Sequence, residues 1–548
     1  MDIKTIQIMS NLKDRIYIQS WLQFKPYEKQ ASTDTYYLRL CNEVKQAILS
    51  AEQFWVLFRF LNKELANDLS CFLTSYFEDI ISGTEIWNTF IKFHTRLYHK
   101  PLPFYNTEEY YEGEINQQDI SFLIWYFLNT VQDEKFIAPF NGFIEKTSVN
   151  IYEVFDAAWD NAPENKALRA FYNIPENEKD FYKARNLIDI ILYKTYLFYP
   201  DTFLRLRKSE QEMIDEFQNI ENILSYLNET RDFHLHSSHT RLLAMSGKEW
   251  AAGILEKNHP LYHDFQDISP KIRGYFLYKG QDDTDVFLEH IASGKKFNLT
   301  KKSFDHSHTL QVIDTILFIG IVRWRYEWWF SGVFIQSEYK SDLVLDEKNS
   351  LESRSAVNFL DHQEQNVEEL LEQQRKAFMD FTGGHQIIFM EANKIDGFIK
   401  EYFEHYTLSL NKTDKEKEEA VERVRAAGFL GGEQRIHDFS EDSDSGLVFF
   451  NPKSGPEIAL AINSAFPLPN NLFFNMDDSE EHIMRLLFDE GLSKELSIFC
   501  IDKCSTDLPF FKEKVGISYL ADIDFLLRFW KKGNYFSNPS ITFTGSTS

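Results

Sequence analysis

The chain has 548 residues, too many for one hydrophobic core, so we expect two to four domains. Its hydrophobic content of 43% is ordinary for a folding sequence and argues against a mainly disordered protein. The formal charge of -26 repels phosphate backbones and anionic lipid, which argues against nucleic acid as the main ligand unless a local basic patch overrides it.

The cysteine content and the apolar runs indicate a compartment. No CxxC pair is present, so the sequence supports neither a disulfide framework nor a zinc ribbon. The first residues lack the apolar run of a signal peptide, and the runs 122–128 and 316–322 are too short to span a membrane. We therefore expect a cytoplasmic protein with reduced thiols. The cysteines are Cys41, Cys71, Cys500 and Cys504.

Helical periodicity dominates the first part of the chain. Apolar residues recur at steps of three and four from Leu61 to Ile80, and Gly83 follows as a stop. Residues 120–131 are apolar on nearly all sides, which predicts a helix buried in the domain centre. Further helices are expected at 144–159, 182–198 and 209–227. We interpret residues 1–245 as a helical domain.

A β module follows the helical domain. Ser246 and Glu249 have the spacing of a capping box, which predicts a helix over 248–255. Residues 270–337 then consist of short apolar and aromatic runs separated by glycines, the pattern of several short strands joined by tight turns. Six strands in so short a span can close a small barrel or form a strongly twisted sheet. The module covers residues 246–340, including its leading helix.

The C-terminal part alternates helical and strand patterns. Residues 338–353 are polar and acidic and are interpreted as a linker. Strands are predicted at 385–390, 447–451 and 496–502. Such alternation favours an α/β domain over 341–548, and the whole chain is predicted to be an α+β multidomain protein. The helices expected here are 367–382, 395–406, 413–428, 456–463, 479–490 and 522–532.

The β module also carries the leading candidate for a binding surface, a group of lysines and arginines interleaved with aromatic residues. Small barrels that bind single strands combine a positive groove with stacking rings, and aromatic grooves also bind peptides. In the alternative interpretation, the rings fill the barrel or cover a neighbouring domain, and the lysines protect a solvated edge. The candidates are Lys295, Lys296, Lys301, Lys302, Arg323, Trp324, Arg325, Tyr326 and Trp328.

Two weaker constellations remain. His234, His236 and His239 could share a metal if they lay in a strand, although no fourth ligand is indicated and three polar residues in a connector are the simpler interpretation. Asn451 to Glu457 is interpreted as a strand-to-helix turn, where Lys453, Ser454 and Gly455 could hold an anion. The order of a phosphate-binding loop is absent, so a plain capped turn is the alternative. No metal and no cofactor is predicted.

Several stretches are similar to a known family. WLQFKPY (21–27), IASGKKFNLTKKSFD (291–305), LVFFNPKSGPEIALAINSAFPLPNN (447–471) and DIDFLLRFWKKGNY (522–535) resemble an uncharacterised family of bacterial proteins. That family is found mainly in Bacteroidetes and is carried only as a domain of unknown function. The resemblance covers most of the chain and implies a bacterial cytoplasmic protein, with no activity, cofactor or catalytic residues.

The leading functional hypothesis is a non-enzymatic interaction protein. Its aromatic and basic β module would bind another macromolecule, with protein favoured over nucleic acid and no membrane involved. The alternative is an enzyme of unrecognised class with a site in an interdomain cleft. The sequence contains none of the hydrolase, metalloprotease or kinase motifs that would favour the alternative.

Overall fold

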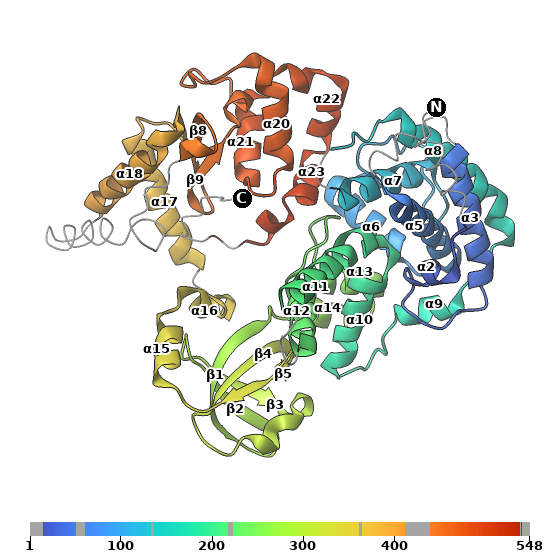
Figure 1. The fold of residues 1–548 in the computed structure, drawn as a ribbon, viewed down its shortest axis with the longest axis horizontal. Coiled ribbons are helices and arrows are strands. Elements are labelled where there is room, and N and C mark those ends of the chain that lie inside the picture. Colours follow the sequence, from blue (N-terminus) through green and yellow to red (C-terminus); the bar gives the residue numbers. More distant parts are fainter. Residues whose placement is uncertain are drawn as a thin grey trace. The chain divides into compact units, whose positions relative to one another are not determined.

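The structure is a computed structural model that describes residues 15–50, 61–132, 136–217, 223–360, 364–410, 439–537 and 539. The chain forms two compact units, Met1–Val357 and Asn358–Ser548, which we describe separately (Figure 1). Both contain helices and sheet, which confirms the predicted α+β class. The finer division at residues 245/246 and 340/341 stays a prediction. Within the described ranges, no helix combines the length and the hydropathy needed to cross a membrane.

The first unit begins with helices, as predicted. Asn62 caps the N-terminus of α5 by accepting from the Leu65 amide, and Gly83 ends the helix in the left-handed conformation. The helices are α2 (Ile18–Leu22), α3 (Asp34–Ser50), α5 (Lys63–Ser82), α6 (Ile86–Tyr98), α7 (Gln117–Val131), α8 (Gly142–Ala158), α9 (Lys166–Phe171), α10 (Phe181–Lys194), α11 (Leu204–Glu216), α12 (Ile223–Ser237), α13 (Gly247–Leu255) and α14 (Tyr262–Gln266).

Helix α7 lies at the centre of this helical part. Every residue from Asp119 to Asn129 is buried, which confirms the prediction of a helix buried on all sides. Asp119 itself accepts hydrogen bonds from the hydroxyls of Tyr76, at 2.7 Å, and Tyr110, at 2.9 Å. These bonds favour the charged carboxylate, but burial outweighs them and raises the pKa of Asp119 to about 7.

The predicted six-strand module is confirmed, and it closes. The strand order is β1-β2-β3-β5-β4, and β4 returns to β1, so five strands form a barrel while β6 pairs with β4. One residue pair, Leu299 with Trp328, joins the parallel strands β3 and β5. The strands are β1 (Ile272–Gln281), β2 (Asp285–His290), β3 (Lys296–Thr300), β4 (Ile316–Trp324), β5 (Glu327–Phe330) and β6 (Ile335–Ser337).

A buried group of charges joins the barrel to α12, which lies beside it in Figure 1. The ammonium of Lys271 lies 2.8 Å from Glu229 Oε1 and 2.7 Å from Asp232 Oδ2. Arg185 of α10 donates to Asp232 Oδ1 at 2.7 Å, and the Ser331 hydroxyl donates to the same carboxylate at 2.9 Å. We call Arg185, Glu229, Asp232 and Lys271 the ion cluster.

The electrostatics of the ion cluster are internally balanced. Burial alone would raise the pKa of Asp232, but the positive charges of Lys271 and Arg185 outweigh burial and lower that pKa to about 2. Two glycines allow the side chains of Lys271 and Glu229 to lie close to the backbone. A Cβ at Gly320 would lie 2.2 Å from Lys271 Cε, and one at Gly332, whose φ is +98°, would lie 2.1 Å from Glu229 Oε2.

The predicted linker at 338–353 is wrong, because this segment is helical. It forms α15 (Ser341–Asn349) and most of α16 (Leu351–Ser355). Val344 of α15 is buried in a cluster with Leu277, Ile291 and Ile316 of the barrel module. Leu343, which is partly buried, packs against the same cluster. Two neighbouring apolar side chains thus hold the helix on the barrel, and so short an apolar run is typical of a linker when only the sequence is considered.

The second unit contains a three-stranded antiparallel sheet of order β7-β8-β9. Helices α17 and α18 pack on it through a cluster that includes Phe378, Tyr402, Val448 and Phe450. The elements are α17 (Glu364–Phe381), β7 (Ile387–Glu391), α18 (Ile395–Ser409), β8 (Ser445–Asn451), β9 (Gly455–Leu460), α20 (Ser479–Phe488), α21 (Lys494–Cys504), α22 (Lys514–Ala521) and α23 (Ile523–Trp530). The helix predicted at 413–428 falls outside the described residues.

Two predictions in this unit are wrong. Residues 456–463 were expected to be a helix, but most of them form strand β9, because Gly455 with φ of +81° turns the chain back and Pro456 pairs with Phe450 at the sheet edge. Residues 496–502 were expected to be a strand, but they lie in α21. There Ser493 caps the helix, and Leu496, Cys500 and Cys504 recur every fourth residue on its buried face.

The ion cluster yields a stability prediction. Asp232→Ala should lower the free energy of unfolding of the first unit by about 3–5 kcal/mol, because Lys271 and Arg185 lose the carboxylate that compensates their burial. Urea unfolding followed by tryptophan fluorescence measures this, since nine of the ten tryptophans precede residue 358. The control Glu327→Ala removes the exposed pair with Lys302 and should cost at most about 1 kcal/mol. Equal losses in the two variants would contradict the prediction.

Asp119 yields a pH prediction. Its folded-state pKa of about 7 lies above the value of about 4 in an unfolded chain, so its contribution to stability is complete at low pH and declines as the pH rises toward 7. Asp119→Asn cannot ionise. The free energy of unfolding of the native protein should therefore fall relative to that of the variant by up to about 1.4 kcal/mol per pH unit over this range. Urea unfolding of both proteins at several pH values tests this, and a constant difference would refute it.

Candidate functional site

The nine candidates on the β module divide into side chains that the fold uses and side chains that it leaves exposed. Trp324 is buried: its ring packs against Phe265 of α14 and Phe181 of α10, with centroids 5.4 and 6.5 Å apart. Figure 1 shows α14 and α10 beside the barrel. Trp324 therefore contributes to the packing of the helices on β4, as in the alternative interpretation of the aromatic residues.

Several of the basic candidates pair with other groups of the chain. Arg325 Nε lies 3.1 Å from Asp264 Oδ2, and its guanidinium also donates to the Glu178 carbonyl at 3.2 Å. Lys302 lies 2.6 Å from Glu327, and the Lys301 ammonium donates to the Asp282 carbonyl. Lys295 is half-buried. These contacts reduce the positive charge that the module offers to a ligand.

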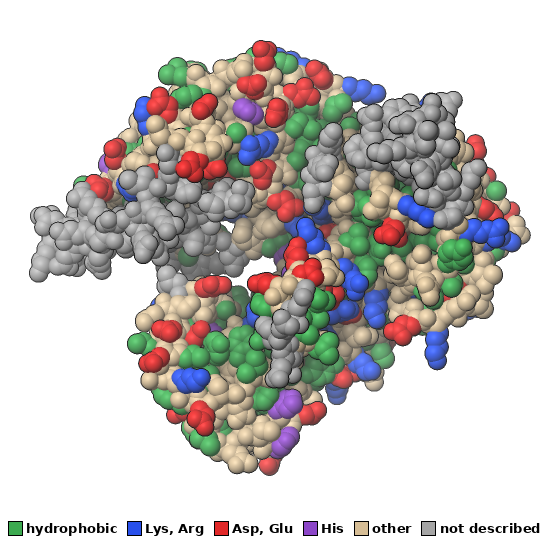
Figure 2. Space-filling model, viewed as in Figure 1, with side chains coloured by type: hydrophobic (Ala, Val, Ile, Leu, Met, Phe, Trp, Pro, Cys, Tyr) green, Lys and Arg blue, Asp and Glu red, His purple; other side chains and the backbone are tan. Residues whose placement is uncertain are grey.

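Four candidates remain accessible: Lys296, Arg323, Tyr326 and Trp328, which we call the hairpin surface. Arg323 and Trp328 are directly opposite one another in the β4–β5 register. Trp328 is half-buried, with its ring edge-on to Phe297 at 5.0 Å. Tyr326 is fully exposed, at 100%. On the face in Figure 2, acidic side chains are widely spread, and the barrel part shows more of them than basic ones.

The two residues that precede Tyr326 at the hairpin tip are held by contacts with the rest of the unit. The turn between Trp324 and Glu327 has only two residues, and Arg325 adopts a φ of +52° there. Trp324 is buried just before the turn, and Arg325 is tied to Asp264. Because its neighbours are fixed, the exposed ring of Tyr326 is presented by a rigid backbone.

The histidines predicted as possible metal ligands lie in and just after a helix. His234 and His236 belong to α12, where a two-residue step turns the side chains to different faces, so the strand geometry assumed for a shared metal is wrong. His239 lies just beyond the helix end. Among the described residues, no group of three or more His, Cys, Asp or Glu side chains is arranged to hold a metal ion.

His236 instead lies next to the ion cluster. Its Nε2 is 3.2 Å from Ser331 Oγ and 4.0 Å from Asp232 Oδ1, a set of residue types that also serves nucleophilic catalysis. Here the Ser331 hydroxyl donates directly to Asp232, and all three side chains are buried. Burial lowers the pKa of His236 to about 4, so the imidazole is neutral. The arrangement holds the barrel on α12 and leaves no approach for a substrate.

The candidate anion loop at Lys453, Ser454 and Gly455 is the turn of the β8–β9 hairpin. No helix follows it, so the helix N-terminus that would hold an anion is absent from this turn. Lys453 lies 3.8 Å from Glu495, and its amide donates to Asn451 Oδ1. The structure thus gives these residues the role of a hairpin turn.

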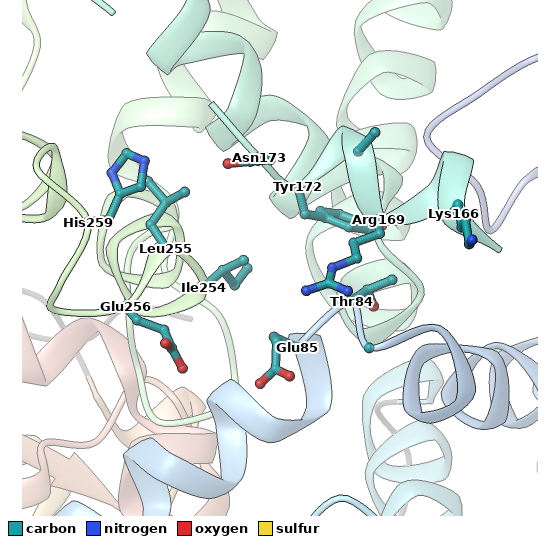
Figure 3. Close-up of a pocket in the computed structure, with 12 residues that line it drawn as sticks. Thr84, Glu85, Lys166, Arg169, Tyr172, Asn173, Ile254, Leu255, Glu256 and His259 are labelled. Carbon is teal, nitrogen blue, oxygen red and sulfur yellow. The ribbon is translucent and has the colours of Figure 1, made fainter. Parts of the chain in front are cut away.

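A polar pocket that the sequence did not predict lies in the first unit, with a volume of about 530 Å³. Figure 3 shows that it is formed where helix ends meet: the turn between α5 and α6, the end of α9 and the end of α13. Arg169 extends into it from α9, and Glu85 and Glu256 also line it, with their carboxylates directed toward the bottom of the view. Lys166 extends away from the two glutamates.

The charges in the pocket are only partly matched by the chain. Lys92 joins the glutamates, with its ammonium 2.6 Å from Glu256 Oε1 and 3.3 Å from Glu85 Oε2. Asn88 also donates to Glu85 Oε2, at 2.6 Å. Within the described part of the chain, Glu85 Oε1, Glu256 Oε2 and the Arg169 guanidinium make no hydrogen bond and no ion pair.

His259, which also lines the pocket, has a structural role. The Leu261 amide donates to its Nδ1 at 3.2 Å, which places the ring proton on Nε2, and Nε2 lies 3.2 Å from the Ile174 carbonyl. Both ring nitrogens are therefore engaged with backbone. The pocket offers charged groups for binding but no imidazole free to transfer a proton.

Both pocket glutamates occupy backbone conformations that favour glycine. Glu85 has φ of 66° and ψ of 10°, and Glu256 has φ of 63° and ψ of 161°. Such conformations cost about 1–3 kcal/mol each in a residue with a Cβ. The exposed pairs with Lys92 return at most about 1 kcal/mol each. The ion pairs alone do not offset the strain, and strain of this kind clusters at functional sites.

Sequence reasoning missed this pocket because its residues lie far apart in the chain. One weak signal was available. The helix over 248–255 was predicted, and the residue after its end is Glu256, where glycine or asparagine is the usual choice. Neither the orientation of Arg169 nor the left-handed backbone at Glu85 has a sequence signature.

Comparison with known proteins gives one family match. Residues 15–284 match the model of a family described as "Protein of unknown function (DUF3843)". Over these residues, just under half of its length, the chain is similar to that family. The matched region includes every pocket residue, but it ends before the hairpin surface. Of the four stretches that resemble the uncharacterised bacterial family, it includes only WLQFKPY (21–27). Searches of curated proteins and of solved structures return no match.

The strain at Glu256 yields a prediction. Glu256→Gly should raise the free energy of unfolding by about 1 kcal/mol, because relief of the backbone strain exceeds the loss of the exposed pair with Lys92. Urea unfolding followed by tryptophan fluorescence measures it. Glu256→Gln keeps the strain and removes the charge, so it should lower stability by no more than about 1 kcal/mol. Destabilisation by the glycine would show that the backbone at residue 256 is unstrained.

Proposed function

We propose that this chain is a non-enzymatic interaction protein of the bacterial cytoplasm, and that its hairpin surface binds another protein. The observation that carries the proposal is Tyr326, which is fully exposed at the tip of a turn whose neighbours are fixed by burial and an ion pair. A large ring normally loses solvent contact on folding, and its complete exposure on a rigid backbone is what a recognition anchor requires. The free, buried cysteines fit a reducing compartment.

The composition of the hairpin surface favours a protein partner. Tyrosine, tryptophan and arginine are the residue types that contribute most binding energy at protein interfaces. The hairpin surface combines all three in Arg323, Tyr326 and Trp328. A rigid aromatic anchor loses little conformational entropy on binding, so such a surface can give useful affinity from a small area.

Nucleic acid fits the same surface less well. Lys301, Lys302 and Arg325 are paired with other groups of the chain, which leaves Lys296 and Arg323 as the accessible cations of the candidate set. Affinity for a phosphate backbone grows with the number of phosphates neutralised, and two cations on a chain of net charge -26 neutralise few.

Site-specific photocrosslinking in the cell of origin tests the proposal. A photoreactive phenylalanine analogue at position 326 should form a defined protein adduct, identified by mass spectrometry. Arg323→Ala or Trp328→Ala should reduce its yield about tenfold or more, since loss of an interface anchor typically costs above 1 kcal/mol. The matched control carries the analogue at Tyr111, which is 62% exposed in the helical part of the same unit and should not give this adduct.

The outcomes separate the hypotheses. Adducts that are equally strong at positions 326 and 111, or that are unaffected by the Arg323 and Trp328 variants, would contradict a specific protein interface. Recovery of RNA or DNA from position 326, with a yield that falls steeply with salt, would replace the protein partner by nucleic acid.

A further inference from the structure

We infer that the pocket between α6, α9 and α13 is a binding site for a small zwitterion of the amino-acid class. In this assignment the Arg169 guanidinium binds the ligand carboxylate, and the free oxygens of Glu85 and Glu256 accept hydrogen bonds from its ammonium. The site lies in a different part of the unit from the hairpin surface and does not depend on the protein partner.

The ligand carboxylate is assigned to Arg169 because the guanidinium of this residue has no partner among the described residues. Its guanidinium extends into the hollow, as Figure 3 shows, and within the described residues it has no acidic or carbonyl partner. The planar guanidinium presents paired N–H groups whose geometry matches the two oxygens of a carboxylate. Arginines elsewhere in the unit, such as Arg231 with Asp189, bind carboxylates of the chain in this two-bonded manner.

The ligand ammonium is assigned to Glu85 and Glu256 because their negative charges exceed the positive charge beside them. Within the described part of the chain, Glu85 and Glu256 carry two negative charges and share one positive charge, that of Lys92, so one negative charge is left over. Each glutamate also keeps one carboxylate oxygen that is not bonded within the described residues. Helix α13 ends at Leu255, which places the negative end of its dipole beside Glu256. One ammonium group satisfies both the leftover charge and the free oxygens.

The two ends together select a zwitterion. Arg169 and the glutamate pair line the same pocket and carry charges of opposite sign. A simple anion would compensate only Arg169, and a simple amine only the glutamates. A divalent cation would need several carboxylate oxygens, and the Lys92 ammonium already occupies that position. The volume of about 530 Å³ lies within the range of small-molecule sites and leaves room for a ligand side chain.

The backbone strain agrees with this assignment. Glycine would remove the strain at residue 256 but would also remove the carboxylate. A strained glutamate is expected where the side chain is needed for binding and the backbone holds it in the binding position.

Calorimetric titration of the full chain, in a buffer free of carboxylates and amines, tests the proposal. The probes are the proteinogenic amino acids taken singly, with propionate, ethylamine and inorganic phosphate as compounds that match at most one end. At least one amino acid should bind at millimolar or lower concentration. Propionate and ethylamine should bind about tenfold more weakly or worse, because each lacks one charge-assisted contact.

Variants connect the binding to the named side chains. Arg169→Ala should lower the affinity for the amino acid about tenfold or more, and Arg169→Lys should restore part of that affinity. Arg39→Ala, which removes an exposed arginine of α3 outside the pocket, should change nothing. Glu256→Gly should lower the affinity for the ligand and raise the free energy of unfolding of the free protein. A purely structural glutamate would not produce these two opposite effects.

Three results would overturn the inference. They are the absence of binding by every amino acid at millimolar concentration, affinity that Arg169→Ala leaves unchanged, and propionate or phosphate that binds as tightly as the best amino acid. The last result would make the pocket a site for simple anions. Circular dichroism of each variant confirms folding, which is expected because Arg169 is exposed and bonds to no other described side chain.

Discussion

The burial of Lys271 between Glu229 and Asp232 is the interaction on which the arrangement of the first unit depends. Charges removed from water must be compensated, so Lys271, just before β1, is held against Glu229 and Asp232 of α12. In this arrangement Phe181 lies against Trp324, and α14 lies close enough for Asp264 to meet Arg325. The hairpin tip is fixed as a consequence. Tyr326, fully exposed, thus follows two residues that are held by contacts within the unit.

Local patterns were sufficient for most of the fold. The helix over residues 120–131, the capping box at Ser246 and the strands between 270 and 337 each depend on neighbours in sequence, and all were predicted correctly. The errors occurred where short segments were ambiguous. Residues 496–502 are too short for periodicity to separate a buried helix from a strand, and Pro456 is equally acceptable at a helix start and on an edge strand.

The candidate sites were harder to predict because their properties depend on partners far away in the chain. The sequence correctly places Arg325 and Tyr326 next to one another, but it does not show that Asp264 takes the charge of Arg325 while Tyr326 stays exposed. The polar pocket was even harder to predict from the sequence. Glu85, Arg169 and Glu256 come from three separated helix ends, and only the closed fold brings them to one hollow.

The first unit uses the same residue types in two opposite ways, and the difference separates support from recognition. In the ion cluster, Lys271 and Arg185 are matched by Asp232 and Glu229, and Ser331 contributes a further bond, so nothing is left for a ligand. In the pocket, among the residues that the structure describes, a single lysine compensates the glutamates and Arg169 has no anionic partner. Charges that a fold completes from its own residues hold it together, whereas exposed charges left incomplete around a hollow are available to a ligand from solution. By this criterion, the buried serine, histidine and aspartate next to Lys271 are structural, and the open pocket is the site at which a small molecule should be sought.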